Sequence, residues 1–90
     1  MRFVAIEPDD VFDAEDGRRV VLVDQDVVVV SPMAAVLLDV VAEGETDLPE
    51  LARRLVDVFG PPPPPSDVEH TVRLLAGELA ERDLLEIVSE

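Results

Sequence analysis

The side chains of this 90-residue chain that could take part in catalysis are one histidine, His70, together with carboxylates and three serines. A histidine that acts as a catalytic base needs a nucleophile to activate or an acid to orient it. On a helix over residues 66–83, the acidic side chains lie only loosely near His70, and the chain has no cysteine. A surface histidine is the better interpretation, and we expect no enzyme activity.

Metal and cofactor sites are equally poorly supported. Close pairs of acids could bind calcium weakly, but the spacing of an EF-hand loop and its bidentate glutamate are absent, so solvated turns are the better interpretation. These pairs are Asp9 with Asp10, Asp24 with Asp26, and Glu43 with Glu45. A carrier protein would need a serine for phosphopantetheine, usually within Asp-Ser-Leu; Ser31, Ser66 and Ser89 lie in Val-Ser-Pro, Pro-Ser-Asp and Val-Ser-Glu. We therefore expect no metal and no cofactor.

The charge of the chain restricts its partners. Twenty-one acids oppose seven bases, all of them arginine, for a net charge of −14. Such a field repels phosphate, which argues against nucleic acid and against an anionic membrane, and it suits a partner with a basic surface. Acid that merely keeps a small apolar domain in solution is the alternative interpretation. Without an apolar run of membrane-spanning length or a signal-peptide pattern, we expect a cytoplasmic protein.

The N-terminal third reads as a small antiparallel β-meander of about three strands within residues 3–30. Asp16-Gly17 favours a turn, residues 18–23 are strand-like, and Asp24-Gln25-Asp26 is a second tight connection. The next strand is a run of four valines, Val27, Val28, Val29 and Val30. A strand that is apolar on both faces is either covered on both or available to a partner. The run therefore suggests a binding surface, although which valines point inward stays open.

Three helices are expected after the strands, at about residues 32–43, 48–59 and 66–83. Ser31 with Pro32 and Asp47 are start signals, Gly44 and Gly60 are end signals, and Ser66 to Glu69 has the pattern of a capping box. Residues 61–65 are all proline and predict a stiff polyproline spacer, and residues 84–88 an apolar tail that packs back or forms a short strand. Apolar stripes predict the core faces of the second and third helices. These stripes are Leu48, Leu51, Ala52, Leu55, Val58 and Phe59, and Val68, Val72, Leu75, Ala76 and Leu79.

Together these elements make one α+β domain of winged helix-turn-helix-like type. Three segments carry a further resemblance: Val-Ser-Pro-Met-Ala-Ala-Val-Leu-Leu-Asp-Val-Val-Ala-Glu-Gly (30–44), Leu-Pro-Glu-Leu-Ala-Arg-Arg-Leu (48–55) and Asp-Val-Glu-His-Thr-Val-Arg-Leu-Leu-Ala-Gly-Glu-Leu-Ala-Glu-Arg-Asp-Leu-Leu-Glu (67–86). In this order they resemble the PqqD-like peptide chaperones, also called RiPP recognition elements, over roughly residues 18–88. Two departures are Val30-Ser31, where the family usually has Leu-Asn, and Asp83-Leu84-Leu85, where it has Gly-Leu-Leu.

The resemblance implies a function without catalysis. Members of the family bind the leader segment of a ribosomally made precursor peptide and present it to a maturation enzyme, such as a radical SAM enzyme, a cyclodehydratase or a leader peptidase. The leader adds as a strand to the third strand of the sheet and packs against the third helix. Here that assigns the edge to Val27–Val30 and one wall of a groove to the third helix. The helix residues expected there are Thr71, Leu74, Leu75 and Glu78, with Asp67 and His70 near the mouth.

Two other functions stay open. A winged-helix transcriptional regulator would use the third helix to read DNA, but the acids on that helix are wrong for phosphate. An acidic adaptor would dock a basic enzyme surface through charge alone, without a groove. The exposed valine edge could also pair two copies into a homodimer.

Overall fold

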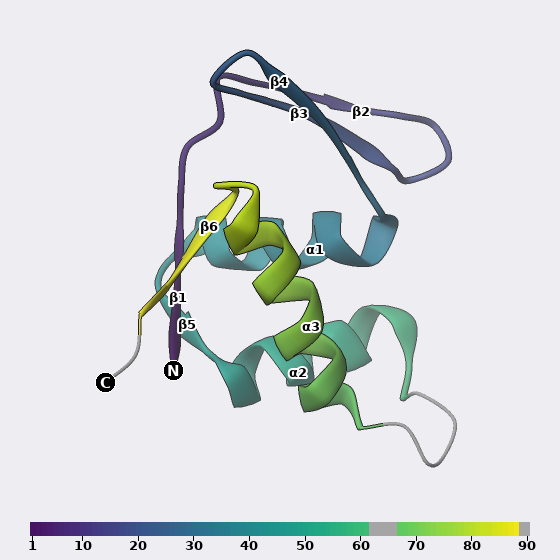
Figure 1. Cartoon of the computed structure of the whole chain (residues 1–90). Coiled ribbons are helices and arrows are strands. Elements are labelled where there is room, and N and C mark those ends of the chain that lie inside the picture. Colours follow the sequence, from purple (N-terminus) through teal and green to yellow (C-terminus); the bar gives the residue numbers. More distant parts are fainter. Residues whose placement is uncertain (62–66, 89–90) are drawn as a thin grey trace.

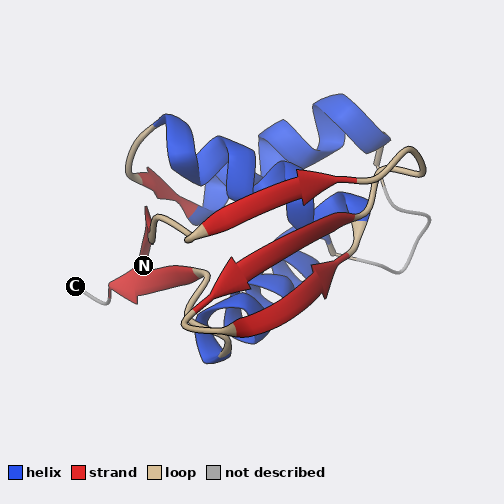
Figure 2. Cartoon of the chain, turned by 90° about the horizontal axis from the view of Figure 1, so that it is seen from above, coloured by secondary structure: helices blue, strands red, loops and turns tan. Residues whose placement is uncertain are grey.

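The computed structural model describes residues 1–61 and 67–88, which form an α+β domain of two small sheets and three helices (Figure 1). The predicted class, an antiparallel meander followed by three helices, is confirmed. One sheet has the strand order β2-β3-β4 and the other the order β5-β1-β6. Seen from above, the first sheet lies in front and the helices lie behind it, so one face of this sheet is uncovered (Figure 2).

The meander consists of β2 (Asp10–Asp13), β3 (Arg19–Val23) and β4 (Asp26–Val30). The last two strands form a hairpin whose two turn residues, Asp24 and Gln25, both have positive φ, 48° and 73°. Positive φ at both positions is the geometry of a type I′ turn, which matches the twist of antiparallel strands. The second tight connection expected from the sequence is therefore a two-residue hairpin turn.

The second sheet joins the two ends of the described chain and was not predicted. Strand β1 (Arg2–Ala5) pairs antiparallel with both β5 (Thr46–Asp47) and β6 (Leu85–Val88). The apolar tail thus forms a strand, one of the two outcomes expected for it. The register sets Phe3 opposite both Thr46 and Ile87, and the Phe3 side chain is fully buried.

Helices α1 (Pro32–Glu43), α2 (Leu48–Phe59) and α3 (Val68–Glu81) begin and end largely where the local signals place them. The Ser31 and Asp47 side chains accept hydrogen bonds from the third backbone amides that follow them, at 3.2 and 3.0 Å. Helix α3 is an exception, because its N-cap is Asp67, whose carboxylate accepts from the Glu69 amide at 2.9 Å. The predicted helix start at Ser66, like the spacer of residues 62–65, lies outside the described residues.

The core lies between the helices and the inner faces of both sheets. Its largest fully buried side chains come from all parts of the chain: Phe3, Leu37, Leu51, Leu55 and Leu85. The predicted stripe of α2 is wrong at its C-terminal end, where Val58 and Phe59 are 58% and 43% exposed, since burial on this face ends one turn earlier at Leu55. Val68 and Leu75 of the α3 stripe are only half-buried. Across the described residues, no helix combines the length and apolar character needed to cross a membrane.

Candidate peptide-binding groove

The four valines of β4 separate into two faces. Val28 and Val30 are 7% and 5% exposed and point into the core, whereas Val27 and Val29 are 68% and 59% exposed on the opposite face. This is the ordinary alternation of a strand with one covered face. It settles which valines point inward, a question that four identical residues leave open.

Among the described strands β4 pairs with β3 alone, so the other side of its backbone is an open edge. A two-residue turn closes with a hydrogen-bonded pair, here Val23 and Asp26, and hydrogen-bonded pairs alternate along an antiparallel ladder. Val28 and Val30 therefore direct their N–H and C=O groups towards β3. The N–H and C=O groups of Val27 and Val29 point away from the sheet, where an added strand would pair with them.

The other edge of the same sheet, β2, is partly blocked. The register and the same alternation direct the Val11 amide away from β3. The Asp10 carboxylate accepts a hydrogen bond from this amide at 2.8 Å, so an outward donor of β2 is already occupied. Charged side chains of this kind are a common protection of sheet edges. Of the two edges, β4 is the one that offers its main chain.

A cavity of about 260 Å³ lies directly beneath the β4 edge, between this strand and the C-terminal half of α3. The buried side chains of Val28, Ala34 and Leu79 form its floor, whereas most of the lining surface that remains accessible is polar. The residues on its α3 side are three or four positions apart, as expected for one face of a helix. The lining residues are Val27, Val28, Val29, Val30, Ser31, Ala34, Leu75, Glu78, Leu79 and Arg82. We call this cavity, together with the β4 edge above it, the β4 groove.

The structure brings together only part of the predicted site. The four valines, Leu75 and Glu78 line the β4 groove, whereas Asp67, His70, Thr71 and Leu74 are not among its lining residues. The reason is the direction of α3: its C-terminal end lies nearest the sheet and its N-terminal end lies farthest away (Figure 1). Asp67 and Thr71 contribute to the start of the helix, where the Thr71 hydroxyl donates to the Asp67 carbonyl oxygen at 3.3 Å.

Arg82 is the lining residue that the sequence reasoning missed. It is the C-cap residue of α3 and follows Leu75 and Glu78 by seven and four residues, so it continues their face of the helix, a spacing that could have indicated it. Arg73 and Arg82 are the two arginines that form no ion pair within residues 1–61 and 67–88. The α3 wall of the β4 groove therefore has one carboxylate, Glu78, and one guanidinium, Arg82, beside the apolar side chains of Leu75 and Leu79.

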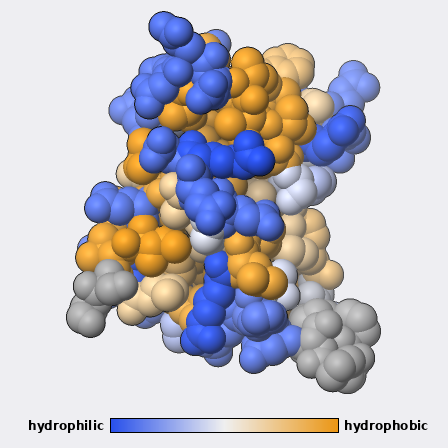
Figure 3. Space-filling view, in the orientation of Figure 1, coloured by the Kyte–Doolittle hydropathy of each residue, from blue (hydrophilic) through white to orange (hydrophobic). Residues whose placement is uncertain are grey.

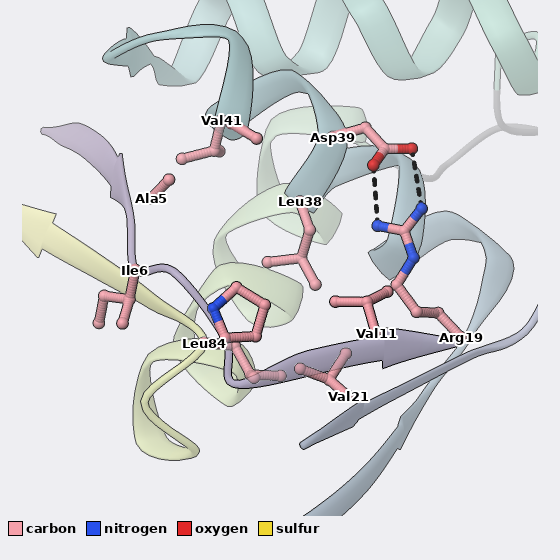
Figure 4. A pocket seen from close by; sticks show the side chains of 11 residues that line it. Ala5, Ile6, Val11, Arg19, Val21, Leu38, Asp39, Val41 and Leu84 are labelled. Carbon is pink, nitrogen blue, oxygen red and sulfur yellow. Dashed lines mark hydrogen bonds and ion pairs between the residues drawn. The ribbon is translucent and has the colours of Figure 1, made fainter. Parts of the chain in front are cut away.

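A second cavity, of about 250 Å³, lies under the β2 edge of the same sheet, between its inner face and α1 (Figure 4). Its lining is mainly apolar, with Val11, Val21 and Leu38 among its residues. Its guanidinium is already fully engaged: Arg19 donates to Asp39 at 2.8 and 3.1 Å and to Asp13 at 2.6 Å. The hydrogen bonds to Asp39 in particular raise the pKa of Arg19, and the carboxylates of Asp39 and Asp13 neutralise its charge. These ion pairs indicate that Arg19 stabilises the fold rather than binds a ligand.

No group of three or more histidines, cysteines or acids within the described ranges is close enough to hold a metal ion. Comparisons with known proteins give no guidance on the site, because no family model, curated protein or solved structure matches the chain. The interpretation of the β4 groove therefore depends on its own geometry.

Proposed function

We propose that this protein binds an extended peptide, the leader segment of a ribosomally synthesised precursor, by β-strand addition to β4. It would present the leader to a maturation enzyme in the cytoplasm and catalyse no reaction itself. The observation that carries the proposal is the coincidence of an open main-chain edge with a cavity beneath it. Strand addition uses these two features, since main-chain pairing provides affinity and side-chain pockets provide register.

In this proposal each part of the β4 groove has a role. The leader backbone would pair with the N–H and C=O groups of Val27 and Val29. Because side chains alternate along a strand, every second leader side chain would point down into the cavity. There an apolar side chain would contact Leu75 and Leu79, which lie on the α3 wall.

The charges of the β4 groove would select among leaders. A leader side chain that reaches α3 would meet Glu78 and Arg82, and a leader with one acidic and one basic residue at matching spacing would satisfy both. Since neither side chain has an ion-pair partner within the described residues, no existing ion pair has to be broken on binding. A buried carboxylate or guanidinium without a partner would reduce the affinity for other peptides.

The test is a titration of the isotope-labelled protein with synthetic leader segments from the precursor-like reading frames nearest its gene, followed by backbone amide NMR. We expect saturable shifts at Val27–Val30 and at Leu75–Arg82. Shifts confined to acidic surface residues would support the charge-driven adaptor instead, and shifts produced only by duplex DNA would support a transcriptional regulator. Either result would contradict leader binding.

A pair of variants at Val29 separates main-chain pairing from side-chain contact. Val29→Pro removes an outward N–H, and proline is tolerated on the open side of an edge strand, so the sheet should persist while leader binding is lost. Val29→Thr keeps the N–H with a side chain of nearly the same shape and should retain binding. Equal affinity of the two variants would contradict strand addition.

A further inference from the structure

The uncovered face of the β2-β3-β4 sheet is apolar rather than polar. The register aligns Phe12, Val20 and Val29 in one row across the three strands, and Leu22 with Val27 in the next. Phe12 is 67% exposed, and Val20 and Leu22 of the central strand are only half-buried. These five side chains form what we call the outer patch. The helices lie on the other side of this sheet (Figure 2).

An antiparallel sheet with one face in water normally carries polar residues on that face. Here the rows are apolar at five positions, and Asp10 ends the second row. Figure 3 views this sheet from its edge and shows hydrophobic surface near the top of the molecule, where the sheet lies, with hydrophilic surface at either end. A contiguous apolar surface with a polar border is the usual sign of a protein interface.

The charges at the border of the outer patch indicate its partner. Within residues 9–30, seven acids stand against two arginines, Arg18 and Arg19. Both arginines are already paired with acids, Arg18 with Asp16 at 2.7 Å and Arg19 with Asp13 and Asp39. The end of the sheet at the Asp24-Gln25 turn has acids only, with Asp9 and Asp10 on the neighbouring strand end.

These charges disfavour two of the three occupants that an apolar patch could have. A second copy would bring another acidic border against this one whichever way it turned, since both ends of the sheet carry excess acid. An anionic membrane would be repelled for the same reason. A protein with an apolar contact surface bordered by arginine or lysine complements both features.

We infer that the outer patch docks such a basic-rimmed protein and, with the proposed function as its basis, that this partner is the maturation enzyme. Val27 and Val29 connect the two sites, because their side chains belong to the outer patch while their main chains face the β4 groove. A leader added to β4 would extend the outer patch by one strand, so the enzyme would contact protein and leader together. Phe12 lies on β2, at the far edge from the β4 groove, and reports on the outer patch alone.

The experiment places the photo-crosslinking residue p-benzoylphenylalanine at position 12 in cells that naturally produce the protein. The matched control places it at position 59, since Phe59 is also an exposed phenylalanine but lies at the end of α2. We expect position 12 to crosslink one peptide-modifying enzyme through a segment containing arginine or lysine, and position 59 not to do so. Crosslinks to a second copy, to lipid or to no protein would overturn the inference, as would equal yields from both positions.

Charge-neutralised variants complete the test. Asp24→Asn with Asp26→Asn removes two border charges and keeps a residue that tolerates positive φ at position 24, and it should reduce the crosslinking yield at least threefold. Glu69→Gln with Glu81→Gln removes two charges from α3 and should leave the yield unchanged. If leaders still shift Val27–Val30 while position 12 crosslinks no protein, this inference fails and the proposed function stands. If position 12 crosslinks the enzyme while no leader binds, the proposed function fails.

Discussion

The carboxylate of Asp10 accepts a hydrogen bond from the backbone amide of Val11 at 2.8 Å, at the outer side of β2. This contact makes the two edges of one sheet unequal. At the β2 edge an outward main-chain donor is satisfied within the protein, whereas at β4 the outward groups of Val27 and Val29 are available above a cavity. The proposed function depends on this difference.

The first prediction concerns that contact. Asp10→Ala removes the acceptor, so the Val11 amide should exchange with solvent about fivefold faster, as expected for a hydrogen bond worth about 1 kcal/mol. Amide hydrogen exchange followed by NMR measures this. Asp26→Ala removes an acid from the first residue of β4 and serves as the control, with no effect at Val11. An unchanged exchange rate at Val11 in Asp10→Ala would show that the edge is not protected in this way.

Two neighbouring arginines give a prediction on stability. Arg19, whose side chain is 14% exposed, joins β3 to α1 through Asp39 and the Ala35 carbonyl oxygen. Arg19→Ala should lower the free energy of unfolding by about 2 kcal/mol, since it removes packed methylene groups and charged hydrogen bonds. Arg18→Ala removes only an exposed ion pair with Asp16 and should lower the free energy of unfolding far less than Arg19→Ala does. Denaturant unfolding that shows equal losses for both would contradict this account.

A substitution at Thr46 is expected to raise the free energy of unfolding. Its side chain is buried in β5, and its hydroxyl has no hydrogen-bond partner in the described part of the chain. Thr46→Val replaces that hydroxyl with a methyl group of similar volume and should raise the free energy of unfolding by about 1 kcal/mol. Thr46→Ser keeps the hydroxyl and loses a methyl group, and thermal unfolding should place its midpoint below that of the wild type. A loss of stability in Thr46→Val would indicate that the hydroxyl does have a partner.

The contribution of the β4 groove charges to leader binding can be tested by comparing two arginines. Arg82 is the C-cap residue of α3, and Arg73 lies nine residues before it, on the opposite side of the helix. Arg82→Glu should weaken binding of a leader with an acidic residue in its pairing segment by about fivefold, or roughly 1 kcal/mol, and added salt should reduce the difference. Arg73→Glu changes the net charge equally and should alter the affinity less than twofold. Calorimetric titration distinguishes the two, and equal effects would mean that only overall charge matters.

Local signals in the sequence predict much of the fold. Ser31 and Asp47 start helices by accepting amide hydrogen bonds, and Gly44 and Gly60 end them, because these effects act within a few residues. The pairing of β1 with β6 was not predictable, because its strands come from opposite ends of the described chain and no local pattern names a distant partner. The exposure of Val58 and Phe59 was not predicted for a similar reason, since helical periodicity does not show where burial along a helix ends.

The candidate site was predicted only in part, because local patterns do not show which distant elements pack together. The helical spacing identifies Glu78 as a member of one face of α3 but does not say how far along that face the sheet extends. Asp67 and His70 were therefore included although α3 leads away from the sheet there, and Arg82 was missed at the end that lies beneath it. Likewise, four identical valines cannot show which two are buried. The I′ turn at Asp24 and Gln25 decides this, because it sets the register of β4 against β3.

The most direct test of the account is amide hydrogen exchange at the four valines of β4, with and without a saturating leader peptide. In the free protein we expect slow exchange at Val28 and Val30, which pair with β3, and fast exchange at Val27 and Val29. The leader should slow Val27 and Val29 by about tenfold or more, since an amide in an added strand exchanges only when the peptide leaves. Binding that leaves Val27 and Val29 fast, or that slows the amides of β2 instead, would contradict strand addition at β4.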